Sequence, residues 1–230
     1  IKMNLHCCSF ASESFYEVQK KQKNSFLKLG FKPQQIHLYN PEKLNNQFFD
    51  SFPKASEINR YGWFAFKPFF LNSILNEIED NDVLIYLDAN DKPLEGLQSY
   101  ILKTFKKNQD LDILAPSTNY PNFNFLSNFH KNNLSIELLI SSLLNCQPEA
   151  GALIIRNSPR SRLILNAWYQ ITLLHAYELE KYNELKTRWD QETLFILSRI
   201  YKSIKLESWF LYKLKGQGLR SFIKFENFRT

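Results

Sequence analysis

Apolar positions along this chain occur in two patterns, short continuous runs and longer stretches with helical spacing. The short runs are typical of buried strands and cover residues 3–10, 35–39, 83–87, 112–115 and 151–155. The longer stretches predict helices over residues 13–29, 68–78, 94–105, 158–181 and 190–201. Strands that alternate with helices indicate an α/β layer fold with a largely parallel sheet.

Local signals support several of these boundaries. Gly30 predicts the C-terminal cap of the first helix, and Ser158-Pro159 predicts the start of the helix that follows. Residues 117–133 are rich in Asn, Ser, Pro and Phe without periodicity, which predicts a long loop of the kind that is often functional. We find neither an internal repeat nor a linker.

The apolar run DVLIYLDAND, residues 82–91, ends in two acids and an amide. In an open α/β sheet, ligands bind beyond the carboxyl ends of the strands. If the chain stays extended, Asp88 and Asn90 point to the same side and converge on one ion. A sharp bend after Ala89 would bring Asp91 in instead. Oxygen ligands of this kind suit Mg²⁺ or Mn²⁺ together with substrate phosphates, although the same residues also favour a plain turn.

Composition and charge narrow the class of protein. The 230 residues suit one domain, and 20 Phe argue against disorder. The net charge of +6 favours anionic partners, but it is spread along the chain and equally suits a solvated basic face. No P-loop, GxGxxG, HExxH or nucleic-acid motif is present, so we expect no nucleic-acid partner.

The cysteines and the apolar runs give evidence on the cellular compartment and on membrane segments. Cys7, Cys8 and Cys146 form no CxxC pair, which favours buried free thiols in a reducing compartment. No run approaches the ~18 apolar residues of a membrane helix, and no signal-peptide pattern opens the chain. Because the sequence begins at Ile1, an anchor or a further domain could have been removed.

Three segments share an order and spacing with a known family. They are RYGWFAFKPFFLNSILNEIEDNDVLIYLDAND (residues 60–91), PEAGALIIRNSPRSRLILNAW (148–168) and RWDQETLFIL (188–197). Together they resemble GT-A type glycosyltransferases, particularly bacterial enzymes that build surface polysaccharides. The family's W-K-P triplet is Phe66-Lys67-Pro68 here, its D-x-D is Asp88-Ala89-Asn90, and its E-A-G and D-Q motifs are retained.

The resemblance implies a GT-A-like, Rossmann-type single domain over residues 1–230, whose mixed, mostly parallel central sheet is flanked by helices. Residues up to about 116 would bind the nucleotide, and residues 117–230 would bind the acceptor and carry catalysis. The implied reaction moves a sugar from a nucleotide-sugar, with a UDP-sugar as the expected donor, to a hydroxyl of a saccharide or glycolipid acceptor. The expected location is the cytoplasm, with peripheral association at the inner face of a membrane.

Site residues follow from matching positions. The implied catalytic residues are Glu149, Asp190 and Gln191. The implied metal ligands, for Mn²⁺ or Mg²⁺, are Asp88, Asn90 and Asp91. The implied nucleotide-sugar-binding residues are Cys8, Ser9, Phe10, Arg60, Trp63, Lys67, Asp88, Ala89, Asn90, Gly151, Lys213 and Lys215.

Each assignment has a physical reason and an alternative. Lys67, beside the positive end of a helix, needs an anion close by, and a donor phosphate would supply it. Gly151 would allow close approach of a sugar, or merely tight strand packing. Asp190 suits either catalysis or a plain helix cap. Trp63 and Trp189 suit either sugar stacking or a core.

The basic C-terminal segment is expected to close over the diphosphate or to be simply solvated. Asn90 is a poorer ligand than the acid it replaces, which weakens the case for metal dependence. Either stereochemical outcome fits, with Glu149 and Asp190 as candidates for a general base.

Two rival functions remain. A catalytically degenerate GT-A fold would bind sugar or protein without turnover, and Asn90 is its best support. A phosphatase of the haloacid-dehalogenase type also ends an apolar strand in D-x-D. In that class, however, Asn90 would remove the general acid, and the strand normally lies near the N-terminus.

Overall fold

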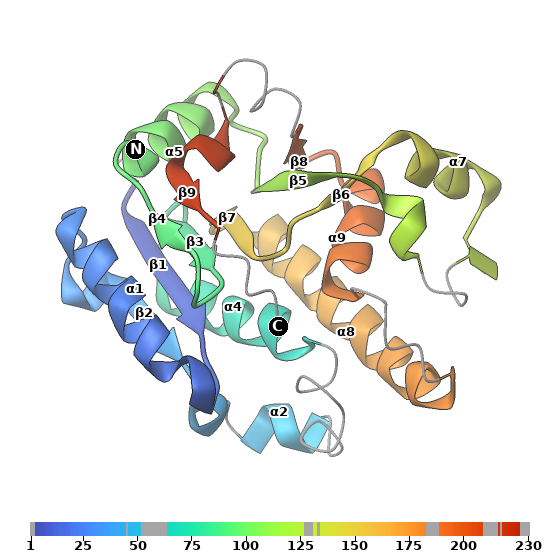
Figure 1. Cartoon of the computed structure of the whole chain (residues 1–230), viewed down its shortest axis with the longest axis horizontal. Helices are drawn as coiled ribbons and strands as arrows, with labels where there is room; N and C mark the ends of the chain where they lie inside the picture. Colours follow the sequence, from blue (N-terminus) through green and yellow to red (C-terminus); the bar gives the residue numbers. More distant parts are fainter. Residues whose placement is uncertain are drawn as a thin grey trace.

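The computed structural model describes residues 3–44, 46–51, 64–126, 131–132, 134–182, 189–208, 216 and 218–225. Within them, a seven-stranded sheet has the order β2-β1-β3-β7-β5-β6, with β8 paired to β5 (Figure 1). Its strands are β1 Leu5–Phe10, β2 Ile36–Tyr39, β3 Val83–Leu87, β5 Ile113–Pro121, β6 Cys146–Pro148, β7 Ala152–Arg156 and β8 Ile204–Glu207. A small second sheet pairs β4 Lys92–Pro93 with β9 Ile223–Lys224.

Strand directions confirm a mixed, mostly parallel sheet. Strand β1 is parallel to both β2 and β3, and β5 is parallel to β8. Strand β7 lies between β3 and β5 and is antiparallel to both, so β3 and β5 run the same way. The turn that precedes β7 therefore lies at the carboxyl end of β3, where Leu87 pairs with Ala152.

The helices largely follow the predicted apolar spacing. They are α1 Tyr16–Lys28, α2 Asn46–Ser51, α4 Phe66–Glu77, α5 Leu97–Lys107, α7 Ile136–Leu144, α8 Pro159–Tyr182 and α9 Trp189–Ile200. Gly30 has a positive φ of 89° after α1, as its predicted capping role requires. The Ser158 hydroxyl accepts a hydrogen bond from the Ser161 amide at 3.0 Å, which confirms the predicted start of α8.

Two apolar clusters cover the two faces of the sheet. On β3, Leu84 and Tyr86 belong to the cluster that contains α4, α8 and α9. Val83, Ile85 and Leu87 belong to the opposite cluster, with α1 and α5. Burial on both faces explains the continuous apolar run of β3, and each such side chain contributes roughly 1.5–3 kcal/mol.

The predicted loop over residues 117–133 is wrong for most of its described part. Strand β5 continues through Pro121, and the 3₁₀ helix η4 Asn122–Phe125 follows. The extension has no apolar periodicity because it is held by pairing with β6, at Ser117 with Pro148 and at Pro121 with Cys146. Residues 127–130 and 133 lie outside the described part.

Among the described residues, no helix combines the length and the apolar character needed to cross a bilayer.

Candidate active site

The carboxyl end of β3 meets the β6–β7 turn. The Asp88 amide donates a hydrogen bond to the Gly151 carbonyl at 2.8 Å. From α1, the buried side-chain amide of Gln22 donates to the carbonyls of Asp88 and Asp91, at 2.7 Å each. Three elements far apart in sequence thus fix the backbone of this strand end.

The chain turns immediately after Asp88. The Asp91 amide donates to the Asp88 carbonyl at 2.9 Å, which closes a tight turn through Ala89 and Asn90. The extended geometry that would align Asp88 with Asn90 is therefore wrong. The alternative, a bend after Ala89, is the one found, and it places Asp91 beside Asp88.

The two acids face a glycine. A Cβ atom added to Gly151 would lie 2.8 Å from Asp88 Oδ2 and 3.5 Å from Asp91 Oδ2, so both carboxylates approach one point. The Asp88 side chain is 44% exposed, and its Oδ1 accepts a hydrogen bond from the Tyr86 hydroxyl at 2.5 Å. Burial, together with Asp88, raises the pKa of Tyr86 well above its usual value, so the phenol keeps the proton that it donates.

Lys67 lies beneath Asp88 as a buried cation. Its Nζ donates to Asp190 Oδ2 at 2.6 Å and to the Ala150 carbonyl at 3.0 Å, and it lies 3.8 Å from Asp88 Oδ1. Burial alone would lower the pKa of Lys67, but the carboxylates of Asp190 and Asp88 more than reverse this and raise it. The anions that accompany this lysine are therefore the protein's own, and it links the ends of β3 and α9.

Asp190 and Gln191 lie in the first described turn of α9. Asp190 is buried, and its Oδ1 accepts a hydrogen bond from the Gln191 amide at 2.9 Å while its Oδ2 binds Lys67. Gln191 is also buried, and its Oε1 has no hydrogen-bond partner among the described residues. A buried amide oxygen without a partner is costly unless a ligand or water satisfies it.

Glu149 is paired with the C-terminal segment. Its carboxylate forms an ion pair with Arg220, whose Nε also donates to the Ser117 carbonyl at 3.1 Å. Arg220 belongs to the 3₁₀ helix η5 Leu219–Phe222. The amide of Leu219 donates to Glu207 Oε2 at 2.6 Å, which anchors this segment across β8.

The end of β1 offers mainly backbone to a ligand. Cys8 is fully buried, and burial raises the pKa of its thiol. The Ser9 hydroxyl accepts from the Gln19 side chain at 3.2 Å, and Phe10 stacks on Phe66 with ring centroids 4.0 Å apart. These three side chains are used in packing.

Arg60, Trp63, Lys213 and Lys215 lie outside the described residues, as does the side chain of Trp189.

Sequence reasoning missed Tyr86 and Gln22. Tyr86 lies two positions before Asp88 on a strand, so the alternation of side chains places it on the same face. Gln19 and Gln22 lie three apart on the apolar face of α1 and are both buried. In both cases, a polar residue on a face that the periodicity predicts to be buried is the sequence feature that could have identified the residue.

The possible metal ligands are few. Within the described ranges, no three His, Cys, Asp or Glu side chains form a group suited to a metal ion. Two carboxylates, Asp88 and Asp91, do approach the point beside Gly151. That number fits Mg²⁺-type sites in which substrate phosphates complete the coordination.

No protein-family profile matches the sequence, and no curated protein gives a significant match. Solved structures do share the fold. A glycosyltransferase involved in glycosylation of the major capsid of PBCV-1 aligns with a TM-score of 0.53 and 9% identity, over 92% of this chain and 85% of that one. Mouse xyloside xylosyltransferase 1, in its apo form, aligns with a TM-score of 0.51 and 10% identity, over 98% of this chain and 95% of that one. The expected GT-A-like fold is thereby confirmed.

Proposed function

We propose that this protein is a glycosyltransferase that moves a sugar from a nucleotide-sugar, with a UDP-sugar as the expected donor, to a hydroxyl of a saccharide or glycolipid acceptor. One observation carries the proposal. At the carboxyl end of β3, a half-exposed Asp88 carboxylate is held by Tyr86 and lies close to the buried Lys67, facing a glycine. This is the edge at which an open α/β sheet binds ligands, in a fold shared with glycosyltransferases.

In this proposal Asp88 and Asp91 hold a divalent cation, Mn²⁺ or Mg²⁺. When bound, the cation would supply positive charge for the donor's diphosphate. Gly151 leaves room beside both carboxylates because any larger residue would fill the same space. Asn90 then need not be a ligand, which removes the main sequence argument for a degenerate site.

Asp190 and Gln191 are proposed to act on the donor sugar. Asp190 is held in place by its ion pair with Lys67, and its carboxylate suits stabilisation of positive charge that develops on the sugar. The Oε1 of Gln191, for which the described part of the chain supplies no hydrogen-bond partner, can accept a hydrogen bond from a sugar hydroxyl. Glu149 is the candidate general base, and it would act only after leaving Arg220.

The test is a thermal-shift screen of UDP-, GDP-, CMP- and dTDP-sugars, each with Mn²⁺ and with EDTA, followed by assays of donor hydrolysis and transfer. A ligand that binds the native state alone raises the unfolding midpoint by mass action. We expect one donor to give a shift that requires Mn²⁺ and that disappears in Asp88→Asn and Asp91→Asn.

The matched control is Asp80→Asn, which removes an exposed carboxylate remote from the site. A donor shift without turnover would favour a degenerate binding module. The absence of any shift, together with phosphate-ester hydrolysis, would favour the phosphatase, against which the fold already counts.

A further inference from the structure

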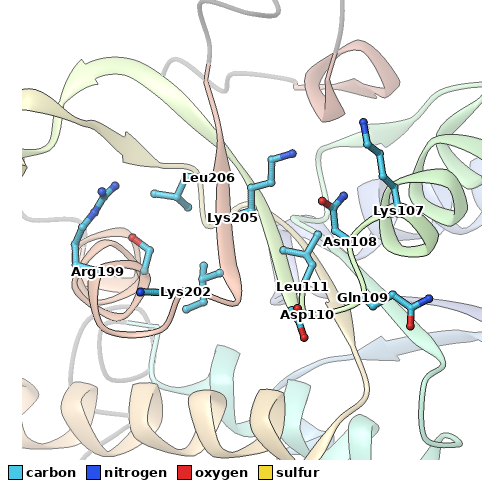
Figure 2. Close-up of a pocket in the computed structure, with 11 residues that line it drawn as sticks. Lys107, Asn108, Gln109, Asp110, Leu111, Arg199, Lys202, Lys205 and Leu206 are labelled. Carbon is cyan, nitrogen blue, oxygen red and sulfur yellow. The ribbon is translucent and has the colours of Figure 1, made fainter.

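A basic groove lies between the ends of α5 and α9 and is crossed by β8 (Figure 2). Its volume is about 580 Å³, within the range of small-molecule pockets. Four cations line it: Lys107 from α5, Arg199 from α9, Lys202 from the turn after α9, and Lys205 from β8. We call this set of residues the basic groove.

The cations of the basic groove outnumber its acids. Among the described residues of the lining, Asp110 is the one acid. Lys205 lies 3.8 Å from Glu207, a carboxylate already bound by Tyr100 and Leu219. Throughout the described part of the chain, the other three cations have no carboxylate within ion-pair distance. Uncompensated like charges close together repel one another, so an anion bound among them would be stabilised.

The cations are also oriented. The Arg199 guanidinium lies over the Phe195 ring, 5.0 Å from its centroid, and partial burial lowers the pKa of the guanidinium. In Figure 2 the side chains of Arg199, Lys205 and Lys107 extend toward the same end of the groove, whereas Asp110 points to the other end. Cations from three different elements thus extend the same way, at separate places across the groove.

Interaction with helix dipoles explains only some of the cations in the basic groove. Lys107 and Arg199 lie in the last turns of α5 and α9, where a cation offsets the helix dipole. Lys205 lies on a strand and Lys202 lies beyond the helix, so the dipoles account for neither of them.

The basic groove is separate from the candidate active site. It lies at the amino ends of β5 and β8, where Ile113 pairs with Ile204. Asp88 follows the carboxyl end of β3, which runs in the same direction as β5. A five-residue strand spans roughly 17 Å, so one diphosphate cannot occupy both places.

We propose that the basic groove is a second anion site, which binds a phosphate-bearing ligand distinct from the donor. The phosphate would come from a free polyphosphorylated molecule or from a lipid headgroup. Ionic contacts with the four cations of the lining would hold it, with Leu206 and Ile204 lining the apolar part of the groove. The proposal does not depend on the transferase function.

The experiment compares two probes on the intact protein. Sodium tripolyphosphate, titrated by calorimetry, represents the free ligand. Flotation with phosphatidylcholine vesicles, with and without 20% phosphatidic acid, represents the headgroup. The test variant is Arg199→Gln/Lys205→Gln. The charge-matched control is Lys20→Gln/Lys21→Gln, on the exposed face of α1.

We expect the test variant to lose at least tenfold in affinity for one or both probes, and the control variant less than twofold. If the test variant loses affinity for tripolyphosphate alone, the phosphate comes from a free ligand. If it loses affinity for the vesicles alone, the phosphate comes from a lipid headgroup. Equal losses in both variants, or no binding of either probe, would overturn the proposal. The cations would then only offset helix ends and protect the edge of β8. If the double variant misfolds, Lys202→Gln serves in its place.

Discussion

Gly151 is the residue on which the geometry of the two acids depends. We expect Gly151→Ala to lower transfer activity at least tenfold, because the new methyl group would displace the Asp88 carboxylate from its position beside Tyr86. The backbone of Gly151 is not in the left-handed region, so the free energy of unfolding should change by less than about 1 kcal/mol. Activity and urea unfolding measure the two effects.

Gly30→Ala is the matched control. Its added methyl group would meet nothing within 4 Å, but its φ of 89° penalises a side chain. This variant should therefore lose stability and retain activity. Equal activity in the two variants would contradict the role given to Gly151.

Lys67 contributes to the stability of the fold. Replacing it with Met would leave Asp190 buried without its cation, which costs about 3–5 kcal/mol of folding free energy. The double variant Lys67→Met/Asp190→Leu should recover part of that loss in urea unfolding, because it removes the stranded charge. If the single variant is as stable as the wild type, the ion pair has no structural role.

His37 should make stability depend on pH. Burial, with His6 and Lys43 nearby, lowers the pKa of His37 from 6.5 to about 4. The unfolded chain therefore binds a proton between these values while the native state does not, so stability falls as the pH drops from 6.5 toward 4. Urea midpoints at pH 7.5 and 5.0 measure this fall, which should be smaller in His37→Gln. If stability falls equally in the wild type and in His37→Gln, the pH dependence comes from other titratable groups.

At the scale of elements, the C-terminal segment is held by specific polar contacts. We expect Arg220→Gln to speed hydrogen exchange in residues 218–225, because it removes the ion pair with Glu149 and the bond to the Ser117 carbonyl. The stacking of Phe222 on Tyr100 should keep the segment in place, so global stability should change little. If hydrogen exchange in these residues is unchanged, the stacking of Phe222 on Tyr100 and the β4–β9 pairing suffice to hold the segment.

Which elements were predictable follows from where their hydrophobic contacts lie. β3 and α4 were found because apolar burial leaves a regular pattern in their own sequences. β6 and β8 were missed because they are short and depend on pairing with β5. The same distinction holds in the site. Asp88 followed from its strand, whereas the ion pairs Lys67–Asp190 and Arg220–Glu149 join residues 123 and 71 positions apart, which no local pattern reveals.

At the scale of the whole molecule, we expect a single cooperative unfolding transition. The two apolar clusters share β3, β5 and β7, whose alternate residues enter opposite clusters. Neither cluster can dissolve without disrupting strands that support the other. Urea curves from tryptophan fluorescence and from far-ultraviolet circular dichroism should therefore coincide. Two separated transitions would instead divide the chain into independent units.

The antiparallel strand β7 also has a consequence for synthesis. Strands β3 and β5 are complete once residue 121 has been made, yet they do not pair with each other, because β7 lies between them. Until residue 156 emerges from the ribosome, the wholly apolar β3 has one open edge, and β5 lacks its neighbour on that side. At typical elongation rates this lasts on the order of several seconds. During that interval the open strand edges can pair with other chains, and a fragment that stops between residues 121 and 152 would keep them open.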